Sequence, residues 1–271
     1  AAIATVGIGS GIGVLIAIPY THFLIETVGW QTSLAILAAT ALMIIPLASP
    51  LSGRPKPAEA TTLDLTLTEA LGEAFSHPSF WLLIAGFFVC GFHVVFYAVH
   101  LPPFVADQGL DPMVGVIGLT VVGIGNLIGT YLSGWWGQRY PKRWGLSFIY
   151  FMRAVIFIGF LYLPITPEFV IAASALLGIF WLSTIPLTSG LVATFFGPKW
   201  MTMLYGIVFF SHQVGAFFGA WVAGYVFDQT QSYDIVWWIS VALGLFAALV
   251  HIPIREAPVP RLAGSAMKPA E

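Results

Sequence analysis

Long apolar runs alternate with short polar turns along almost the whole chain. We place the runs at residues 3–25, 31–49, 79–101, 112–136, 145–163, 169–190, 202–227 and 234–252. Each is about 20 residues or longer, the length that a helix needs to cross roughly 30 Å of hydrocarbon at 1.5 Å per residue. The runs do not alternate with a period of two, so helices are favoured over a barrel. The pattern predicts an all-α membrane protein with about eight transmembrane helices.

Two polar stretches interrupt this pattern. Residues 50–78 form the longest connection, which begins Pro-Leu-Ser-Gly-Arg-Pro-Lys-Pro and separates two apolar runs from six. Within it, Thr66 and Glu69 fit a capping box, and apolar residues then recur at helical spacing. We expect a cytoplasmic linker with a short amphipathic helix at the interface; a disordered connector is the alternative. Residues 254–271 are rich in Pro, and we expect a disordered cytoplasmic tail.

Composition supports a membrane protein. The chain is 58% hydrophobic and only 8% charged, whereas ordinary soluble domains carry roughly 25% charged residues. Glycines recur at four-residue spacing, as in Gly125 with Gly129 and Gly215 with Gly219, which lets helices approach closely in lipid. Cys90 is the one cysteine and lies in an apolar run, so a disulfide within the chain is excluded. We interpret this thiol as a small packed hydrophobe.

The basic residues lie on one side of the predicted membrane. Of the 10 Lys and Arg residues, nine follow even-numbered apolar runs, whereas the other connections carry acidic residues and no basic ones. Because basic connections are retained in the cytoplasm, we expect these loops and the C-terminus inside. The basic residues are Arg54, Lys56, Arg139, Lys142, Arg143, Lys199, Arg255, Arg261 and Lys268; the acidic ones opposite are Glu26, Asp107, Asp111, Glu168, Asp228 and Asp234.

Three segments are similar to a known family. Residues 100–110, His-Leu-Pro-Pro-Phe-Val-Ala-Asp-Gln-Gly-Leu, resemble an outer loop between the seventh and eighth helices, and residues 205–228 resemble an eleventh helix. Residues 134–143, Gly-Trp-Trp-Gly-Gln-Arg-Tyr-Pro-Lys-Arg, resemble the cytoplasmic signature G-x-x-x-D-R-x-G-R-R, with Gln138 at the acidic position and Pro141 at a glycine position. The chain resembles the major facilitator superfamily of secondary transporters, in particular its monocarboxylate-transporter-like bacterial branch. The matching basic residues, which the resemblance makes a conformational-switch loop, are Arg139, Lys142 and Arg143.

This resemblance implies a domain organisation. The family pairs two six-helix bundles around a midplane cavity, with alternating access by rocking of one half. Residues 1–49 then correspond to the last two helices of a truncated N-terminal bundle, and residues 79–253 to a complete C-terminal six-helix bundle. The chain opens with Ala1 and Ala2 before a Gly-rich apolar stretch, unlike a signal peptide, so we expect a fragment. The implied location is the bacterial inner (plasma) membrane, multi-pass, with a cytoplasmic C-terminus.

Arg153 is the one basic residue inside an apolar run. It lies some 12 Å from the expected cytoplasmic edge by helical rise, where an unpaired guanidinium costs at least about 3 kcal/mol. One interpretation is an anion clamp, since Arg offers a planar donor fork for a carboxylate. The alternative is snorkelling toward the cytoplasm, because the resemblance places this ninth helix at the bundle's periphery. No acidic residue occupies mid-span depth elsewhere in the chain.

Other polar residues at membrane depth are candidates for substrate binding. His212 and Gln213 fall near the middle of their run, and His93 and Tyr97 stand one turn apart in another. Histidine titrates near neutrality and suits proton-coupled transport, although a lone His is also often held by a neighbouring hydroxyl or carbonyl. His93 and His100 share a helical face without an acidic or Cys ligand set, so we expect no metal site.

The remaining candidates surround a proline. Asn126, beside two glycines, is explained either by interhelical hydrogen bonding or by substrate contact. Trp181, Ser183 and Thr184 precede Pro186 in a run that the resemblance makes a cavity-lining tenth helix. We therefore expect these side chains to line the substrate cavity.

These observations lead to one preferred function. We expect a secondary active transporter of a small organic anion, a monocarboxylate on the resemblance, coupled to protons or a counter-anion. The alternatives are a non-transporting membrane receptor or structural subunit with the same fold, and a membrane enzyme. An enzyme would need convergent nucleophile, base or metal ligands at one depth, and the sequence shows none. We expect no cofactor, no nucleic-acid partner and contact with the lipid bilayer; the oligomeric state is open, with a monomer expected.

Overall fold

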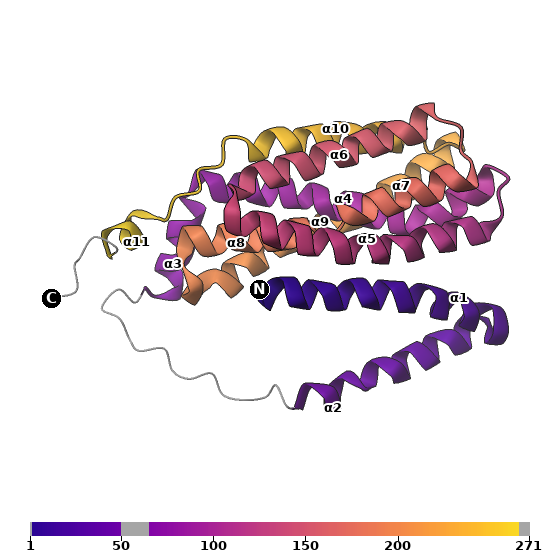
Figure 1. The fold of residues 1–271 in the computed structure, drawn as a ribbon, viewed down its shortest axis with the longest axis horizontal. Helices are drawn as coiled ribbons and strands as arrows, with labels where there is room; N and C mark the ends of the chain where they lie inside the picture. The colour runs from indigo at the N-terminus through magenta and orange to yellow at the C-terminus, as the bar shows by residue number, and fades with distance from the viewer. Residues whose placement is uncertain (1, 50–64, 266–271) are drawn as a thin grey trace.

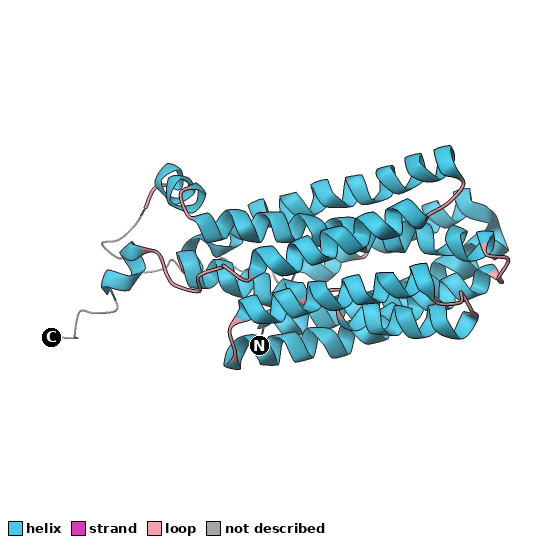
Figure 2. Ribbon diagram, turned by 90° about the horizontal axis from the view of Figure 1, so that it is seen from above, coloured by secondary structure: helices cyan, strands magenta, loops and turns pink. Residues whose placement is uncertain are grey.

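The computed structural model describes residues 2–49 and 65–265, which form helices and no strand (Figure 2). Seven helical stretches of this part are long and apolar enough to cross a membrane. The all-α membrane fold is therefore confirmed. The helices are α1 (Ala2–Leu42), α2 (Ile44–Ala48), α3 (Leu67–Phe75), α4 (Pro78–Asp107), α5 (Pro112–Arg139), α6 (Lys142–Tyr162), α7 (Pro167–Ile179), α8 (Thr184–Phe196), α9 (Pro198–Thr230), α10 (Asp234–His251) and α11 (Pro260–Ser265).

The first of the seven stretches contains two of the predicted runs. It extends over Gly11–Ala48, 38 residues, but Gly29 interrupts α1 with a non-helical φ of 76° and ψ of 162°. Glycine adopts a positive φ without the steric cost that a Cβ would add. The chain reverses at this point, so the two halves of α1 form a hairpin, and α2 continues the second half (Figure 1). Its two arms are the runs predicted at residues 3–25 and 31–49.

The remaining helices form one bundle of lengthwise packed spans. α4 packs against α9, α5 against α7, and α6 against α10, while α7 and α8 follow each other within one span. The first arm of α1 lies on α5, where a Cβ on Gly11 would be 2.9 Å from the Leu127 side chain. The second arm diverges from the bundle (Figure 1).

In the described residues, the bundle interior contains two apolar clusters that lie one after the other along its length. One cluster includes Phe96, Phe157 and Trp237. The other includes Phe80 and Phe195 and lies nearer the basic end, which we define as the end that carries Arg139, Lys142, Arg143, Lys199 and Arg255. Polar side chains at the level where the clusters meet are thus shielded on both sides.

Glycines bring α4 and α9 into close contact. A Cβ on Gly215 would overlap the Phe88 carbonyl oxygen, and one on Gly219 would overlap that of Phe92. A Cβ on Gly91 would overlap the His212 carbonyl oxygen from the opposite side. The small residues predicted to mediate packing at positions 215 and 219 are confirmed in that role.

The helix predicted in the linker is present. α3 begins after Thr66, whose side chain accepts a hydrogen bond from the Glu69 N–H while the Glu69 carboxylate accepts from the Thr66 N–H, which confirms the capping box. These hydrogen bonds from Thr66 lower the pKa of the Glu69 carboxyl. Residues 50–64 of the predicted linker lie outside the described residues.

The predicted disorder of residues 254–271 is wrong for its first part, residues 254–265. Ile254 and Val259 are buried, and the Val259 N–H donates to the Phe195 carbonyl at 3.0 Å. The Arg261 guanidinium then pairs with Glu73 of α3 at 3.1 Å. Proline-rich composition predicts that a segment lacks regular structure, but this one is held against the bundle by two buried apolar side chains, a backbone hydrogen bond and an ion pair. Residues 266–271 lie outside the described residues.

The α4–α9 contact can be tested with a matched pair of glycine substitutions. Replacement of Gly215 by Ala must separate the two helices, and we expect a loss of about 1–3 kcal/mol, as for other overpacked sites. Gly206 in the same helix has open space around its Cβ position, so Gly206→Ala should be neutral or slightly stabilising. Thermal unfolding in detergent measures both, and equal melting temperatures for the two variants would contradict the packing described.

Candidate functional site

A break between α7 and α8 frees backbone groups in the middle of the bundle. The N–H groups of Phe180 and Trp181 bond three residues back, at 3.0 Å each, and not four. Pro186 has no N–H, and the Leu182 carbonyl instead accepts from Ile185 at 3.0 Å. The carbonyls of Phe180 and Trp181 and the N–H of Leu182 are therefore left for partners from other helices.

Arg153 of α6 supplies the donors for this break. Its Nε donates to the Phe180 carbonyl at 3.0 Å, and its Nη2 donates to the carbonyls of Phe180 and Trp181 at 2.5 Å each. The side chain is 1% exposed and lies about 16 Å along α6 from Lys142 by helical rise. The snorkelling alternative is therefore wrong, because the guanidinium points into the bundle and not toward the membrane surface.

The positive charge of Arg153 has no carboxylate partner in the described part of the chain. Its neighbours are the two carbonyls, the Cys90 sulfur at 3.4 Å and the Tyr150 ring at 5.3 Å. Carbonyl dipoles and a ring face stabilise a guanidinium but do not cancel its charge. Within the described residues, Arg153 thus lacks an acidic counter-charge.

Cys90 of α4 is buried in the apolar core, as expected for a small packed side chain, and its sulfur is also the centre of a group of polar contacts. The sulfur lies 3.4 Å from both Arg153 Nη1 and Thr184 Oγ1. The His212 ring and the Tyr150 hydroxyl lie beside the same sulfur. We call these five residues the Cys90 cluster; they come from α4, α6, α8 and α9. The position of Arg153 deep in its apolar run was the sequence feature that pointed to this cluster, because a guanidinium at that depth needs a polar acceptor from another helix.

His212 connects the Cys90 cluster to the surface of α9. Its ring stacks on Phe209, with centroids 5.3 Å apart and an interplanar angle of 5°. His212 Nδ1 lies 3.0 Å from Gln213 Oε1, and Gln213 is exposed. His212 itself is half-buried. The predicted pair His212 and Gln213 therefore forms the accessible side of the cluster.

The structure places His93 and Tyr97 in structural hydrogen bonds. His93 Nε2 lies 2.9 Å from the Ser240 carbonyl, and the Tyr97 hydroxyl lies 2.7 Å from Ser174 Oγ. Trp181 packs edge-on to Tyr97, with centroids 5.8 Å apart. These contacts match the alternative in which a lone His is held by a neighbouring carbonyl. Within the described residues, His93 Nδ1 has no partner.

Two of the remaining candidates also serve the helix break. Asn126 of α5 accepts the free Leu182 N–H at its Oδ1, at 3.0 Å, which is the interhelical hydrogen bond that the sequence allowed. The Ser183 hydroxyl donates to the Ile179 carbonyl one turn earlier. Of the predicted set before Pro186, Thr184 alone reaches the Cys90 cluster through its hydroxyl.

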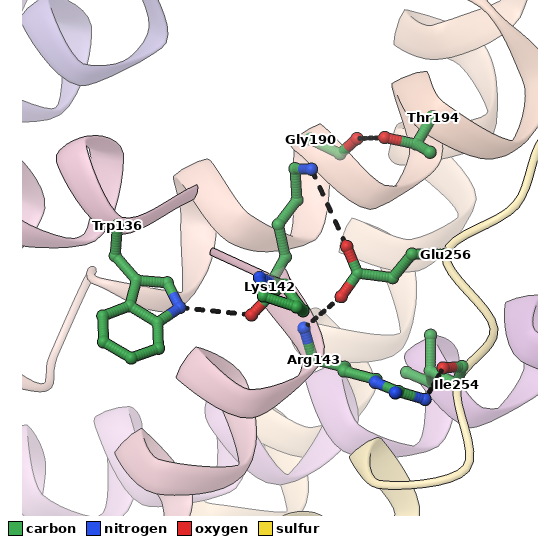
Figure 3. Close-up of polar contacts among 8 residues, drawn as sticks. Trp136, Lys142, Arg143, Gly190, Thr194, Ile254 and Glu256 are labelled. Atoms are coloured by element: carbon green, nitrogen blue, oxygen red, sulfur yellow. Dashed lines mark hydrogen bonds and ion pairs between the residues drawn. The ribbon is translucent and has the colours of Figure 1, made fainter. Parts of the chain in front are cut away.

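The loop between α5 and α6, predicted from the resemblance to be a conformational switch, contacts an acidic residue of the tail (Figure 3). Glu256 accepts the Arg143 N–H at 2.8 Å, and its other oxygen lies 3.8 Å from Lys142 Nζ. Arg143 also donates to the Ile254 carbonyl at 3.0 Å. Arg139 does not join this network, and its guanidinium stacks over Trp135.

Glu256 was not among the residues predicted from the sequence. Gln138, which occupies the acidic position of the signature, donates to the Gly134 carbonyl of its own helix. The carboxylate that meets the basic loop comes instead from the segment after the last span. The sequence feature that could have identified Glu256 is its position directly after Arg255, as an acidic residue in a connection on the basic side of the membrane.

Comparisons with known proteins agree with the fold. The chain is 26% identical over 246 residues to the uncharacterized MFS-type transporter YcxA of Bacillus subtilis, which covers 84% of this chain and 58% of the relative. It is 23% identical over 302 residues to monocarboxylate transporter 12 of Mus musculus, covering 93% and 60%. A 24% identity over 198 residues relates it to the uncharacterized MFS-type transporter YhjX of Escherichia coli, covering 71% and 49%.

The chain spans about three fifths of the length of the first two relatives. A sequence model of the Major Facilitator Superfamily matches residues 1–207 and again residues 117–271. Because the two matches together cover every residue, the chain belongs to the Major Facilitator Superfamily, the family that its loop motifs predicted.

Proposed function

We propose that this protein is a secondary active transporter of a small organic anion, with a monocarboxylate as the substrate class. The class rests on similarity to proteins named monocarboxylate transporters 11 and 12. Transport proceeds by alternating access, coupled to a proton or a counter-anion. The protein acts as a multi-pass protein of the bacterial inner membrane with its C-terminus in the cytoplasm, and as a monomer.

The observation that carries the proposal is the uncompensated charge of Arg153. A buried guanidinium with only neutral acceptors costs free energy at membrane depth, and an approaching carboxylate lowers that cost. The carboxylate does not displace the carbonyls of Phe180 and Trp181, because these fix the break in the span. Arg153 instead attracts the anion through the field that it sets up at the Cys90 cluster.

The substrate reaches this field from the His212 side. The half-buried imidazole and the exposed Gln213 amide offer hydrogen-bond donors to a carboxylate. Phe209, which stacks on the His212 ring with centroids 5.3 Å apart and is 39% exposed, provides an apolar surface for the rest of the molecule. Because histidine gains and loses a proton near neutral pH, His212 couples anion binding to proton uptake.

The contact of Glu256 with the switch loop provides the conformational control. It ties α6 to the segment after α10, and Arg261 ties the same segment to α3. An ion pair at this level of exposure contributes about 1 kcal/mol or less, so it can break during a transport cycle. Arg139, outside the network, contributes to the loop only through its charge.

The proposed function is tested by uptake of radiolabelled monocarboxylates into proteoliposomes that contain the protein, over a range of external pH. We expect saturable uptake that rises as the pH falls, because His212 must be protonated to bind the anion. His212→Gln should remove this pH dependence while the protein stays folded. The control is His100→Gln, since His100 lies outside the cluster, bonded to the Ala220 carbonyl. Equal, unsaturable uptake of all acids tested would contradict the proposal and favour a receptor with this fold.

The role of Arg153 predicts a double effect for Arg153→Lys. A Lys ammonium is a point charge and cannot reproduce the fork that satisfies two carbonyls and a thiol. We expect a loss of at least about 2 kcal/mol of stability from the unsatisfied carbonyls, and a smaller rise in melting temperature when a monocarboxylate is added. Arg255→Lys, at an exposed position, is the control. Unchanged stability together with an unchanged ligand-induced shift would show that Arg153 has neither role.

The tail contact predicts a kinetic effect without a structural one. Glu256→Gln keeps an acceptor for the Arg143 N–H but removes the charge that faces Lys142. We expect the melting temperature to change by no more than the equivalent of about 1 kcal/mol, while the initial uptake rate changes several-fold. Glu168→Gln, at the opposite end of the bundle, serves as the control for loss of a negative charge. Equal uptake rates for wild type and Glu256→Gln would rule out the switch role.

A further inference from the structure

The outer face of the bundle carries an apolar groove between α5, α6 and the α7–α8 break. Its volume is about 290 Å³, and its lining includes Gly129, Leu132, Phe148 and Leu187. Leu132 and Phe148 are 50% and 57% exposed, so the groove opens sideways to the lipid-facing surface.

The polar atoms of the groove wall are already satisfied. The Ser133 hydroxyl donates to the Thr130 carbonyl at 3.1 Å, and the Ser183 hydroxyl donates to the Ile179 carbonyl. What the groove offers is therefore apolar surface at membrane depth, which suits a hydrocarbon chain.

A cation lies at the basic end of this groove. Positions 132, 136 and 139 follow one face of α5, because residues four and three apart lie above one another on a helix. Leu132 and Trp136 line the groove, and Trp136 is fixed by the bond from its Nε1 to the Pro141 carbonyl at 3.1 Å (Figure 3). Arg139 comes next on that face and is exposed.

Within the described residues, Arg139 differs from Lys142, Arg143 and Arg261 in making no hydrogen bond or ion pair with the protein. Lys142 and Arg143 are engaged by Glu256, and Arg261 by Glu73. The guanidinium of Arg139 stacks over the Trp135 ring, 4.7 Å from its centroid. Its donor fork is thus open to an anion at the membrane boundary, and a phosphate group matches that fork.

We propose that this groove binds one acyl chain of an anionic glycerophospholipid, with the lipid phosphate at Arg139. The groove supplies the apolar surface for the chain, and the position of Arg139 one turn beyond Trp136 places its charge at headgroup level. The inner end of the groove is lined by Phe180, whose carbonyl accepts from Arg153. A bound lipid therefore touches the residue that joins the surface to the Cys90 cluster. The binding itself requires the membrane fold and not the proposed transport function.

Native mass spectrometry of the purified protein tests the proposal, with phosphatidylglycerol as the anionic probe and phosphatidylcholine with identical acyl chains as the neutral one. We expect wild type to prefer phosphatidylglycerol by about fivefold, the factor that one basic side chain contributes near an anionic surface. Arg139→Gln should remove this preference. Arg255→Gln, which deletes the same charge at another exposed position of the basic end, should keep it.

A second pair of variants tests the groove. Leu132→Trp fills it from a half-exposed position that tolerates a larger side chain, and should lower binding of both lipids. Ile124→Trp makes a comparable change at a 45% exposed position of α5 outside the groove and should bind as wild type does. Equal lipid selectivity in Arg139→Gln and Arg255→Gln, or equal binding in the two Trp variants, would overturn the proposal.

Discussion

The structure depends on one constraint, that backbone polar groups inside hydrocarbon must find partners within the protein. The break between α7 and α8 frees two carbonyls and an N–H in the middle of the bundle. Arg153 from α6 satisfies the carbonyls, and Asn126 from α5 satisfies the N–H. A charged and an amide side chain at membrane depth are costly separately. Together with the break they form a set in which each member requires the others.

The sequence predicted the framework because length and charge determine it directly. The apolar runs gave the spans, and Gly29 explains why two runs form one hairpin. At the site, the depth of Arg153 identified it as exceptional. Its principal partners are backbone carbonyls, which leave no pattern in the sequence. The sequence therefore could not distinguish an Arg that binds an anion from an Arg that stabilises the break between α7 and α8. Cys90 and Glu256 were missed because their importance comes from neighbours more than 60 and 110 positions away.

Two kinds of contact hold the helices together: close backbone packing at glycines and weaker ion pairs between partly exposed side chains. Close glycine contacts hold α4 and α9 at backbone distance, so His212 and Cys90 move together. The Glu256 contacts at the basic end are partly exposed and involve side-chain charges. Packing of the first kind resists displacement because a core has few alternative arrangements, whereas an exposed ion pair exchanges readily with water. We therefore expect the Cys90 cluster to stay rigid and the contacts at the basic end to break more easily.

The reversal at Gly29 determines the shape of the hairpin and also which side of the membrane the later loops face. A membrane chain alternates sides with each crossing, so the number of crossings before a loop fixes the leaflet that the loop faces. If a residue with a Cβ kept α1 continuous through position 29, one crossing would vanish and every later connection would exchange sides. Arg139, Lys142 and Arg143 would then face the compartment that now receives Asp107 and Asp111. The side of the membrane that each later connection faces thus depends on the positive φ angle of Gly29.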